Sequence, residues 1–295
     1  MNRQISSSFA KYASLSVMGM IGLSCYILAD TFFVAQGLGT NGLAALNLAI
    51  PVYSTIVGTG MMTGMGAATR YSIMRSRNDS KADKIFTNAL YIAAALAVIF
   101  EICGIFFSGS ISKLLGAEGD TYELCRVYLK TLLIFSPFFL LNNISICFLR
   151  NDNAPQRSMA GMLAGSFANI VLDYIFIFPM KMGMFGAVLA TCFAPIISLG
   201  VMSGFYIKKR NSFHLIRTSP DMKLISRIAA TGVPALVTEL SSGIVILVFN
   251  MIIMSLTVHA ATHFKMHSKL SILIDKSNIR CHKICFPFCR KRFHF

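Results

Sequence analysis

Charged residues and tryptophan are scarce in this sequence. Only 13% of the 295 residues are charged and none is tryptophan, while 55% are hydrophobic. A soluble globular domain carries about 25% charged residues. The shortage of charge therefore excludes an ordinary soluble domain and indicates a membrane protein.

Acids are rarer still, with 12 Asp and Glu against 27 Lys and Arg, for a net charge of +15. Such an excess of positive charge can indicate nucleic-acid binding. Here the basic residues lie in short loops and in the last stretch of the chain, not on a face interleaved with aromatic residues. We therefore predict no nucleic-acid partner and expect the protein to lie in a lipid bilayer.

Motifs for covalent chemistry are also missing. The sequence has no nucleophile elbow, no phosphate-binding glycine loop and no paired-histidine zinc motif. The spacing of Cys281, Cys285, Cys289 and His294 differs from that of the usual zinc pairs. We therefore predict no enzyme activity, no metal site and no cofactor.

What the sequence does have is a series of long apolar runs. About 20 apolar residues suffice to cross a bilayer as a helix. The predicted spans are 9–36, 42–69, 85–107, 128–149, 158–179, 184–207 and 225–257. Basic residues gather before the first span and after the second, fourth and sixth, so the positive-inside rule predicts a cytoplasmic amino terminus.

An acid interrupts the fifth span. Asp173 lies where residues should face hydrocarbon, at a cost of roughly 2.5–3.5 kcal/mol for a mid-helix carboxylate on insertion scales. Asn169 precedes it by four residues, which places both side chains on one helix face within hydrogen-bonding reach. Intramembrane acids of this kind are typical of transport proteins.

Four stretches of sequence resemble one transporter family. They are NIVLDYIFIFPMKMGMFGAVLAT (169–191), DTFFVAQGLGTNGLAALNLAIPVY (30–53), FLRNDNAPQ (148–156) and GVPALVTELSSG (232–243). Over roughly Ser8 to Leu256 the sequence resembles the multidrug and toxic compound extrusion (MATE) family. The resemblance implies an all-α polytopic membrane bundle, consisting of the amino-terminal six-helix lobe and the first helix of a second lobe.

The same resemblance implies a site. Asp30 and Asp173 would bind the coupling H⁺ or Na⁺, and Asn169 and Thr191 would supply hydrogen bonds in the cavity of the first lobe. Burial disfavours the charged form of a carboxyl group and a neighbouring acid disfavours it further, so the pair could exchange protons near physiological pH. The alternative for Asp30 is an interfacial helix-end residue near an outer turn at 37–41.

Glu239 matches a family acid that belongs to the cavity of the second lobe. Because the helices that would complete that cavity are not in the sequence, we do not expect Glu239 to work in this chain. The expected divisions are a first lobe at 1–210, a cytoplasmic linker and seventh helix at 211–257, and a basic His- and Cys-rich tail at 258–295. The tail departs from the family, and a truncated or frame-shifted product is its simplest account.

The predicted function is export of small cationic drugs or dyes across a bacterial inner membrane by H⁺- or Na⁺-coupled antiport, with the product inert if one lobe cannot work alone. A flippase for lipid-linked sugars from the same superfamily is the nearest alternative, although its cavity would be lined by basic residues instead of acids. A seven-helix receptor is the alternative from another class. Its amino terminus would lie outside, against the loop charges.

Overall fold

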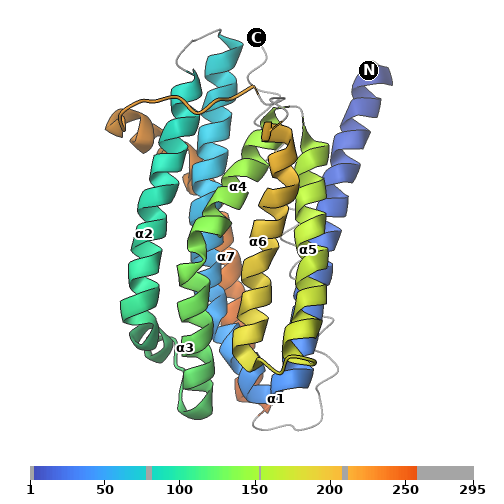
Figure 1. The fold of residues 1–295 in the computed structure, drawn as a ribbon, viewed down its shortest axis with the longest axis vertical. Coiled ribbons are helices and arrows are strands. Elements are labelled where there is room, and N and C mark those ends of the chain that lie inside the picture. Colours follow the sequence, from blue (N-terminus) through green and yellow to red (C-terminus); the bar gives the residue numbers. More distant parts are fainter. Residues whose placement is uncertain (1–2, 78–81, 153, 208–211, 258–295) are drawn as a thin grey trace.

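The protein is a bundle of helices that run along its long axis (Figure 1). A computed structural model describes residues 3–77, 82–152, 154–207 and 212–257. The helices in these ranges are α1 (Arg3–Ser76), α2 (Ala82–Leu114), α3 (Gly119–Ile134), α4 (Ser136–Asn151), α5 (Pro155–Ile177), α6 (Gly183–Ile207) and α7 (Met222–Thr257). By length and composition, five of them could cross a membrane, or six if the bent α3–α4 pair is one span. The predicted all-α polytopic bundle is confirmed, while the predicted tail at 258–295 lies outside the described residues.

Helix α1 contains the first two predicted spans, joined at Gly39. The backbone of Gly39 has φ 66° and ψ −158°, a combination that is essentially restricted to glycine. The first arm of α1 (3–38) and the second arm (40–76) run in opposite directions on either side of it (Figure 1). One glycine conformation therefore makes an antiparallel pair out of one continuous stretch of chain.

The fourth predicted span consists of two helices, since α3 and α4 meet at a bend of 53°. Pro137 lies in the first turn of α4, where its missing N–H is tolerated. Three other prolines of the predicted spans, Pro51, Pro195 and Pro234, lie inside helices that continue through them. Only at Pro137 does a proline coincide with a helix break among these four positions.

The connections of the bundle separate into two sets (Figure 1). The start of α1, the facing ends of α1 and α2 and of α4 and α5, and residues 212–221 before α7 lie at one end, which we call the linker end. The α2–α3 and α5–α6 connections lie at the other. The described helix ends that border the Lys- and Arg-rich loops of the sequence thus share one end of the molecule.

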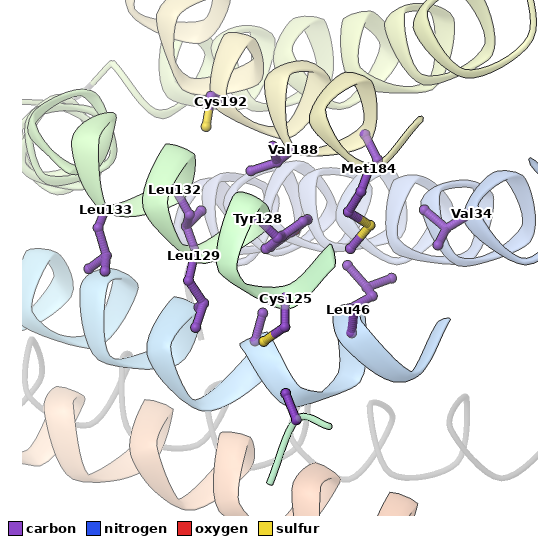
Figure 2. Packing of buried hydrophobic residues seen from close by; sticks show 14 of the residues in the cluster. Val34, Leu46, Cys125, Tyr128, Leu129, Leu132, Leu133, Met184, Val188 and Cys192 are labelled. Atoms are coloured by element: carbon purple, nitrogen blue, oxygen red, sulfur yellow. The ribbon is translucent and has the colours of Figure 1, made fainter. Parts of the chain in front are cut away.

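The largest buried cluster joins α3 to α1 and α6. Tyr128, Leu129 and Leu132 of α3 share this cluster with Val34 of α1 and Val188 of α6, and each is at most 4% exposed (Figure 2). Fully burying such side chains stabilises a fold by about 1.5–3 kcal/mol each in water, whereas in a bilayer close packing takes over this role. This cluster fixes the relative positions of the helices that carry the polar residues described next.

Helix α7 packs along the second arm of α1. A Cβ atom on Gly232 would overlap the carbonyl oxygen of Met62, and one on Gly66 would overlap that of Ile228. Glycine is therefore required on both helices where they cross. The opposite face of α7 exposes large apolar side chains, including Val233, Val237 and Ile244.

Candidate functional site

The four residues assigned to the first-lobe site come together inside the bundle. Asp30 comes from the first arm of α1, Asn169 and Asp173 from α5, and Thr191 from α6. Asn169 and Asp173 are fully buried, while Asp30 is 8% and Thr191 6% exposed. All four side chains are therefore buried in the bundle, Asp30 included.

Close approach of α5 and α6 brings Asn169 and Thr191 into contact. A Cβ atom on Gly165 would lie 2.7 Å from the backbone oxygen of Ala194, so the two backbones nearly touch one turn away from the site. Small residues at such positions let membrane helices pack closely. The glycine therefore has a specific packing role beside the polar residues.

The amide of Asn169 links the two helices. Oriented to satisfy both neighbours, it donates from Nδ2 to Asp173 Oδ2 at 3.1 Å and accepts at Oδ1 from the backbone N–H of Thr191 at 3.2 Å. The hydroxyl of Thr191 donates to the backbone oxygen of Ala187 at 3.2 Å. Asn169 thus holds the Asp173 carboxyl in one orientation relative to α6.

Asp30 lies close enough to Asp173 for the two carboxyl groups to interact electrostatically. Each has one buried oxygen, Oδ1, without a hydrogen-bond partner among the described residues. Two neighbouring buried carboxylates repel each other, so a proton or a cation between them stabilises the pair. The Oδ1 atoms of Asp30 and Asp173 are the acceptors that either occupant would use.

Three tyrosines lie within electrostatic range of Asp30, and sequence reasoning missed all of them. Tyr26 and Tyr53 join the two arms of α1 by a hydrogen bond of 3.1 Å between their hydroxyl groups. Tyr128 lies beside Thr191, and all three rings lie within electrostatic range of Asp30. A signal was available for Tyr26, which precedes Asp30 by four residues just as Asn169 precedes Asp173.

Glu239 is not part of this group. It is half-buried on α7 and faces the second arm of α1, where a Cβ atom on Gly58 would lie 3.1 Å from the Cβ of Glu239. Glu239 also interacts electrostatically with Tyr53. The side chain of Tyr53 therefore lies within electrostatic range of both Asp30 and Glu239.

Among the described residues no group of three or more His, Cys, Asp or Glu could hold a metal ion. The oxygens at the site suit a proton or a hard monovalent cation instead. Ionisable residues buried in a membrane-crossing bundle mark ion and substrate pathways. Fold and site together define a multi-pass membrane transport protein.

Comparison with known proteins gives the family. The MatE family model matches residues 16–175, which is more than half of the chain. The chain belongs to the MATE family of transporters, which are not enzymes. This assignment excludes the seven-helix receptor.

Individual relatives agree with this. The chain is 30% identical to the multidrug export protein MepA of Staphylococcus aureus strain MRSA252 over 229 residues, which are 77% of this chain and 51% of that protein. It is also 30% identical to MepA of Staphylococcus saprophyticus over 252 residues, covering 83% of this chain and 56% of that protein. The chain thus spans about half the length of the curated relatives it matches.

Solved structures show the same fold. A MATE transporter in an outward-facing conformation has a TM-score of 0.71 and 30% identity, and the match covers 79% of this chain and 53% of that one. A transporter of the MOP superfamily from Pyrococcus furiosus has a TM-score of 0.73 and 27% identity, covering 90% of this chain and 61% of that one. The structure of that protein was described as having a binding pocket of reverse polarity, which suggests a different function for it.

Proposed function

We propose that the chain supplies the first lobe of an exporter that moves small organic cations out of the cell in exchange for H⁺ or Na⁺. In this proposal the first lobe occupies residues 1–210, and 211–257 form the linker and the first helix of a second lobe. The observation that carries the proposal is the fully buried Asp173, hydrogen-bonded to Asn169 and beside Asp30. Two interacting acids in the interior of a membrane protein are costly, so such a pair indicates a function.

The mechanism follows from competition for these carboxyl groups. When both carboxyl groups are protonated, the site is neutral and an organic cation gains little there. When protons leave, the negative charge attracts a cation, and Asn169 and Thr191 keep Asp173 in place for either occupant. Exchange of the two occupants across the membrane couples export to the inward flow of H⁺ or Na⁺.

Transport also needs movement of one bundle against another around the central site. The described helices supply one complete bundle, α1 to α6, so a second bundle has to come from further chain or from a second copy. Glu239 is the acid that α7 would contribute to the second lobe. A flippase for anionic, lipid-linked sugars fits less well, because the buried charged residues of the described site are acids.

Binding of tetraphenylphosphonium to the purified chain tests the proposal. We expect Asp173→Asn to weaken binding strongly, because the amide can neither carry the negative charge nor exchange a proton. Glu101→Gln is the matched control, since Glu101 is an acid within α2 that lies outside the site, and it should bind like the parent.

Export of a cationic dye from an efflux-deficient host then shows whether binding serves transport. Asp173→Asn should remove any export that the parent chain supports, alone or together with a second lobe. Unchanged tetraphenylphosphonium binding in Asp173→Asn would contradict the assignment of the site. Binding of anionic sugar phosphates in preference to the cation would favour the flippase.

A further inference from the structure

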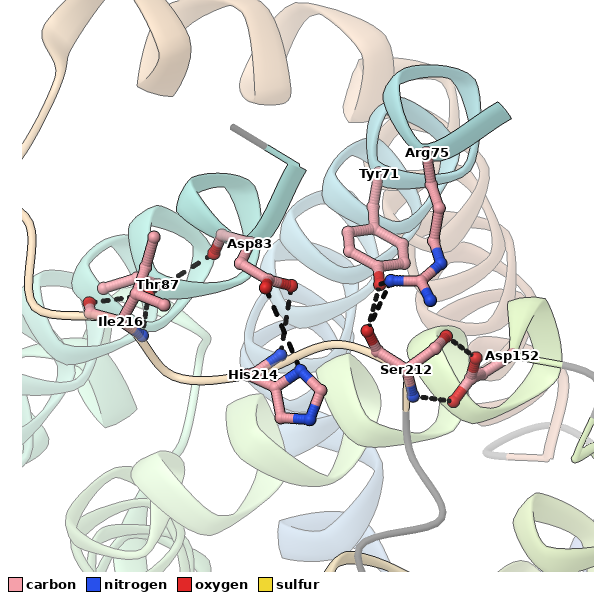
Figure 3. A network of polar contacts seen from close by, with 8 residues as sticks. All are labelled: Tyr71, Arg75, Asp83, Thr87, Asp152, Ser212, His214 and Ile216. Atoms are coloured by element: carbon pink, nitrogen blue, oxygen red, sulfur yellow. Dashed lines mark hydrogen bonds and ion pairs between the residues drawn. The ribbon is translucent and has the colours of Figure 1, made fainter. Parts of the chain in front are cut away.

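The segment between α6 and α7 is held against the first lobe along most of its described length. Residues 212–221, which we call the linker, are not helical and cross the ends of α1, α2 and α4 (Figure 3). The proposed function treats this segment only as a connection. Its contacts indicate a more specific role.

The linker begins at a polar clamp on Ser212. Asp152, at the end of α4, accepts hydrogen bonds from the backbone N–H of Ser212 at 2.8 Å and from its hydroxyl group. The carbonyl oxygen of Ser212 accepts from Tyr71 at 2.7 Å and from Arg75 at 2.6 Å, both on α1. Charge-assisted bonds of this kind are about twice as strong as neutral ones.

Helix α2 binds the backbone of the next residues. Asp83 accepts from the N–H of His214 at 3.1 Å, and the Thr87 hydroxyl bonds both to the N–H and to the carbonyl oxygen of Ile216, each at 3.2 Å (Figure 3). Further along α2, the Tyr91 hydroxyl donates to the Thr218 oxygen at 2.8 Å and Asn88 accepts from the Asp221 N–H at 2.9 Å.

Phe213 adds an apolar contact between these bonds. Its side chain is 1% exposed, and its ring centroid lies 4.8 Å from that of Phe86, 5.0 Å from Phe148, 5.7 Å from Tyr206 and 6.1 Å from Tyr71. Aromatic rings at these separations attract each other beyond simple burial. The linker is thus packed like a core element of the first lobe.

The contact between α7 and α1 has a different character. It is built from small residues at close approach, such as Gly66 against Ile228, Gly232 against Met62 and Gly243 against Ser54. Arg70 adds polar bonds at one end, from Nε to the Arg227 oxygen at 2.8 Å and to the Thr231 hydroxyl at 2.9 Å. At Gly232 the two helices meet through their backbones, whereas Ile228, one turn earlier, is fully buried in the cluster that also holds Phe213. The first turns of α7 are therefore packed with the linker, and the close backbone contact continues beyond them.

We infer that Phe213 and Asp152 are positioning residues that keep the linker, together with the first turns of α7, fixed to the first lobe, so that α7 moves relative to α1 from the Gly232 crossing onward. The consequence for transport rests on the proposed function, because the hinge between lobes would then lie within α7 and not within the linker.

Distances between spin labels test the inference without any transport assay. The native cysteines are first replaced, and two cysteines are then introduced for labelling. One label is always at Val98 on α2. The second is at Leu215 on the linker in one variant and at Val237 on α7 in another. All three side chains are exposed. Gly232→Ala forces α7 away from Met62, so we expect the 98–237 distance to shift while the 98–215 distance stays unchanged. Phe213→Ala should broaden the 98–215 distribution.

Three results would overturn the inference. If Gly232→Ala shifts both distances together, the linker travels with α7; if it shifts neither, α7 is fixed to the lobe. If Phe213→Ala leaves the 98–215 distribution unchanged, Phe213 does not hold the linker.

Amide hydrogen exchange on the unmutated protein is the second measurement. Slow exchange is expected at the amides of Ser212, His214, Ile216 and Asp221, whose N–H groups are bonded to the lobe. Fast exchange at these four amides would also overturn it.

Discussion

Substitution of Asn169 by alanine tests how the proposed site holds its charge. The change removes the 3.1 Å bond from Nδ2 to Asp173 Oδ2, and the other oxygen of Asp173 has no hydrogen-bond partner among the described residues. A hydrogen bond to a charged group contributes about 1.5–3 kcal/mol. The charged form of Asp173, which attracts the cation, therefore loses about this much stabilisation.

Because each 1.4 kcal/mol corresponds to a factor of ten in affinity, tetraphenylphosphonium binding should weaken on the order of 10- to 100-fold at fixed pH. The deficit should shrink as the pH is raised, since fewer protons then compete for the carboxyl group. Calorimetric titration of the purified chain at several pH values measures both effects. Asn142→Ala, which removes an amide from α4 outside the site, is the control and should change affinity little.

A double-mutant comparison separates this explanation from a loss of packing. In an Asp173→Asn background, Asn169→Ala should have no further effect on cation binding, because the charge that it stabilises is already gone. An equal loss of affinity in the parent and in Asp173→Asn would refute the reasoning, as would a deficit that does not depend on pH.

Two further predictions concern topology and folding. Reporter domains that are active only in the cytoplasm should give signal when fused after Arg77 and none when fused after Gly119. The reason is that the helix ends bordering the basic loops lie at the linker end of the bundle. The opposite pattern would reverse the proposed orientation. Gly39→Ala should lower the stability to thermal unfolding in detergent by about 1–3 kcal/mol, since alanine is strained at φ 66° and ψ −158°. Gly200→Ala, in α6 with open space around the added Cβ, should be close to neutral, and equal losses at both positions would argue against backbone strain.

Local sequence signals were sufficient for the spans and for one contact of the site. Long apolar runs fix where helices can cross a membrane, and a spacing of four residues on a helix predicted that Asn169 and Asp173 would meet. The bend between α3 and α4 could not be predicted in this way. Pro137 looks like Pro51, Pro195 and Pro234 in sequence, and only the surrounding packing decides where a helix breaks.

Contacts between distant parts of the chain account for what was missed. The Tyr26–Tyr53 bond depends on the reversal of α1 at Gly39, and Tyr128 reaches Thr191 only because α3 packs between α1 and α6. Residues 212–221 look like an ordinary polar loop. Their own sequence does not predict that side chains of α1, α2 and α4 bind their backbone.

That mode of binding has a consequence for which substitutions the linker can accept. The first lobe bonds mainly to backbone N–H and C=O groups, and proline alone lacks the N–H, so Leu215 and Arg217 are free to change in size and charge. His214 is more restricted, because its Nδ1 also lies 3.9 Å from Asp83 Oδ2. Proline at 214 or 216 would remove a bonded N–H. We expect the linker to tolerate many substitutions during evolution, as long as residue 213 stays aromatic and the bonded positions exclude proline. A saturation library of the linker, scored for folded protein, would measure this pattern.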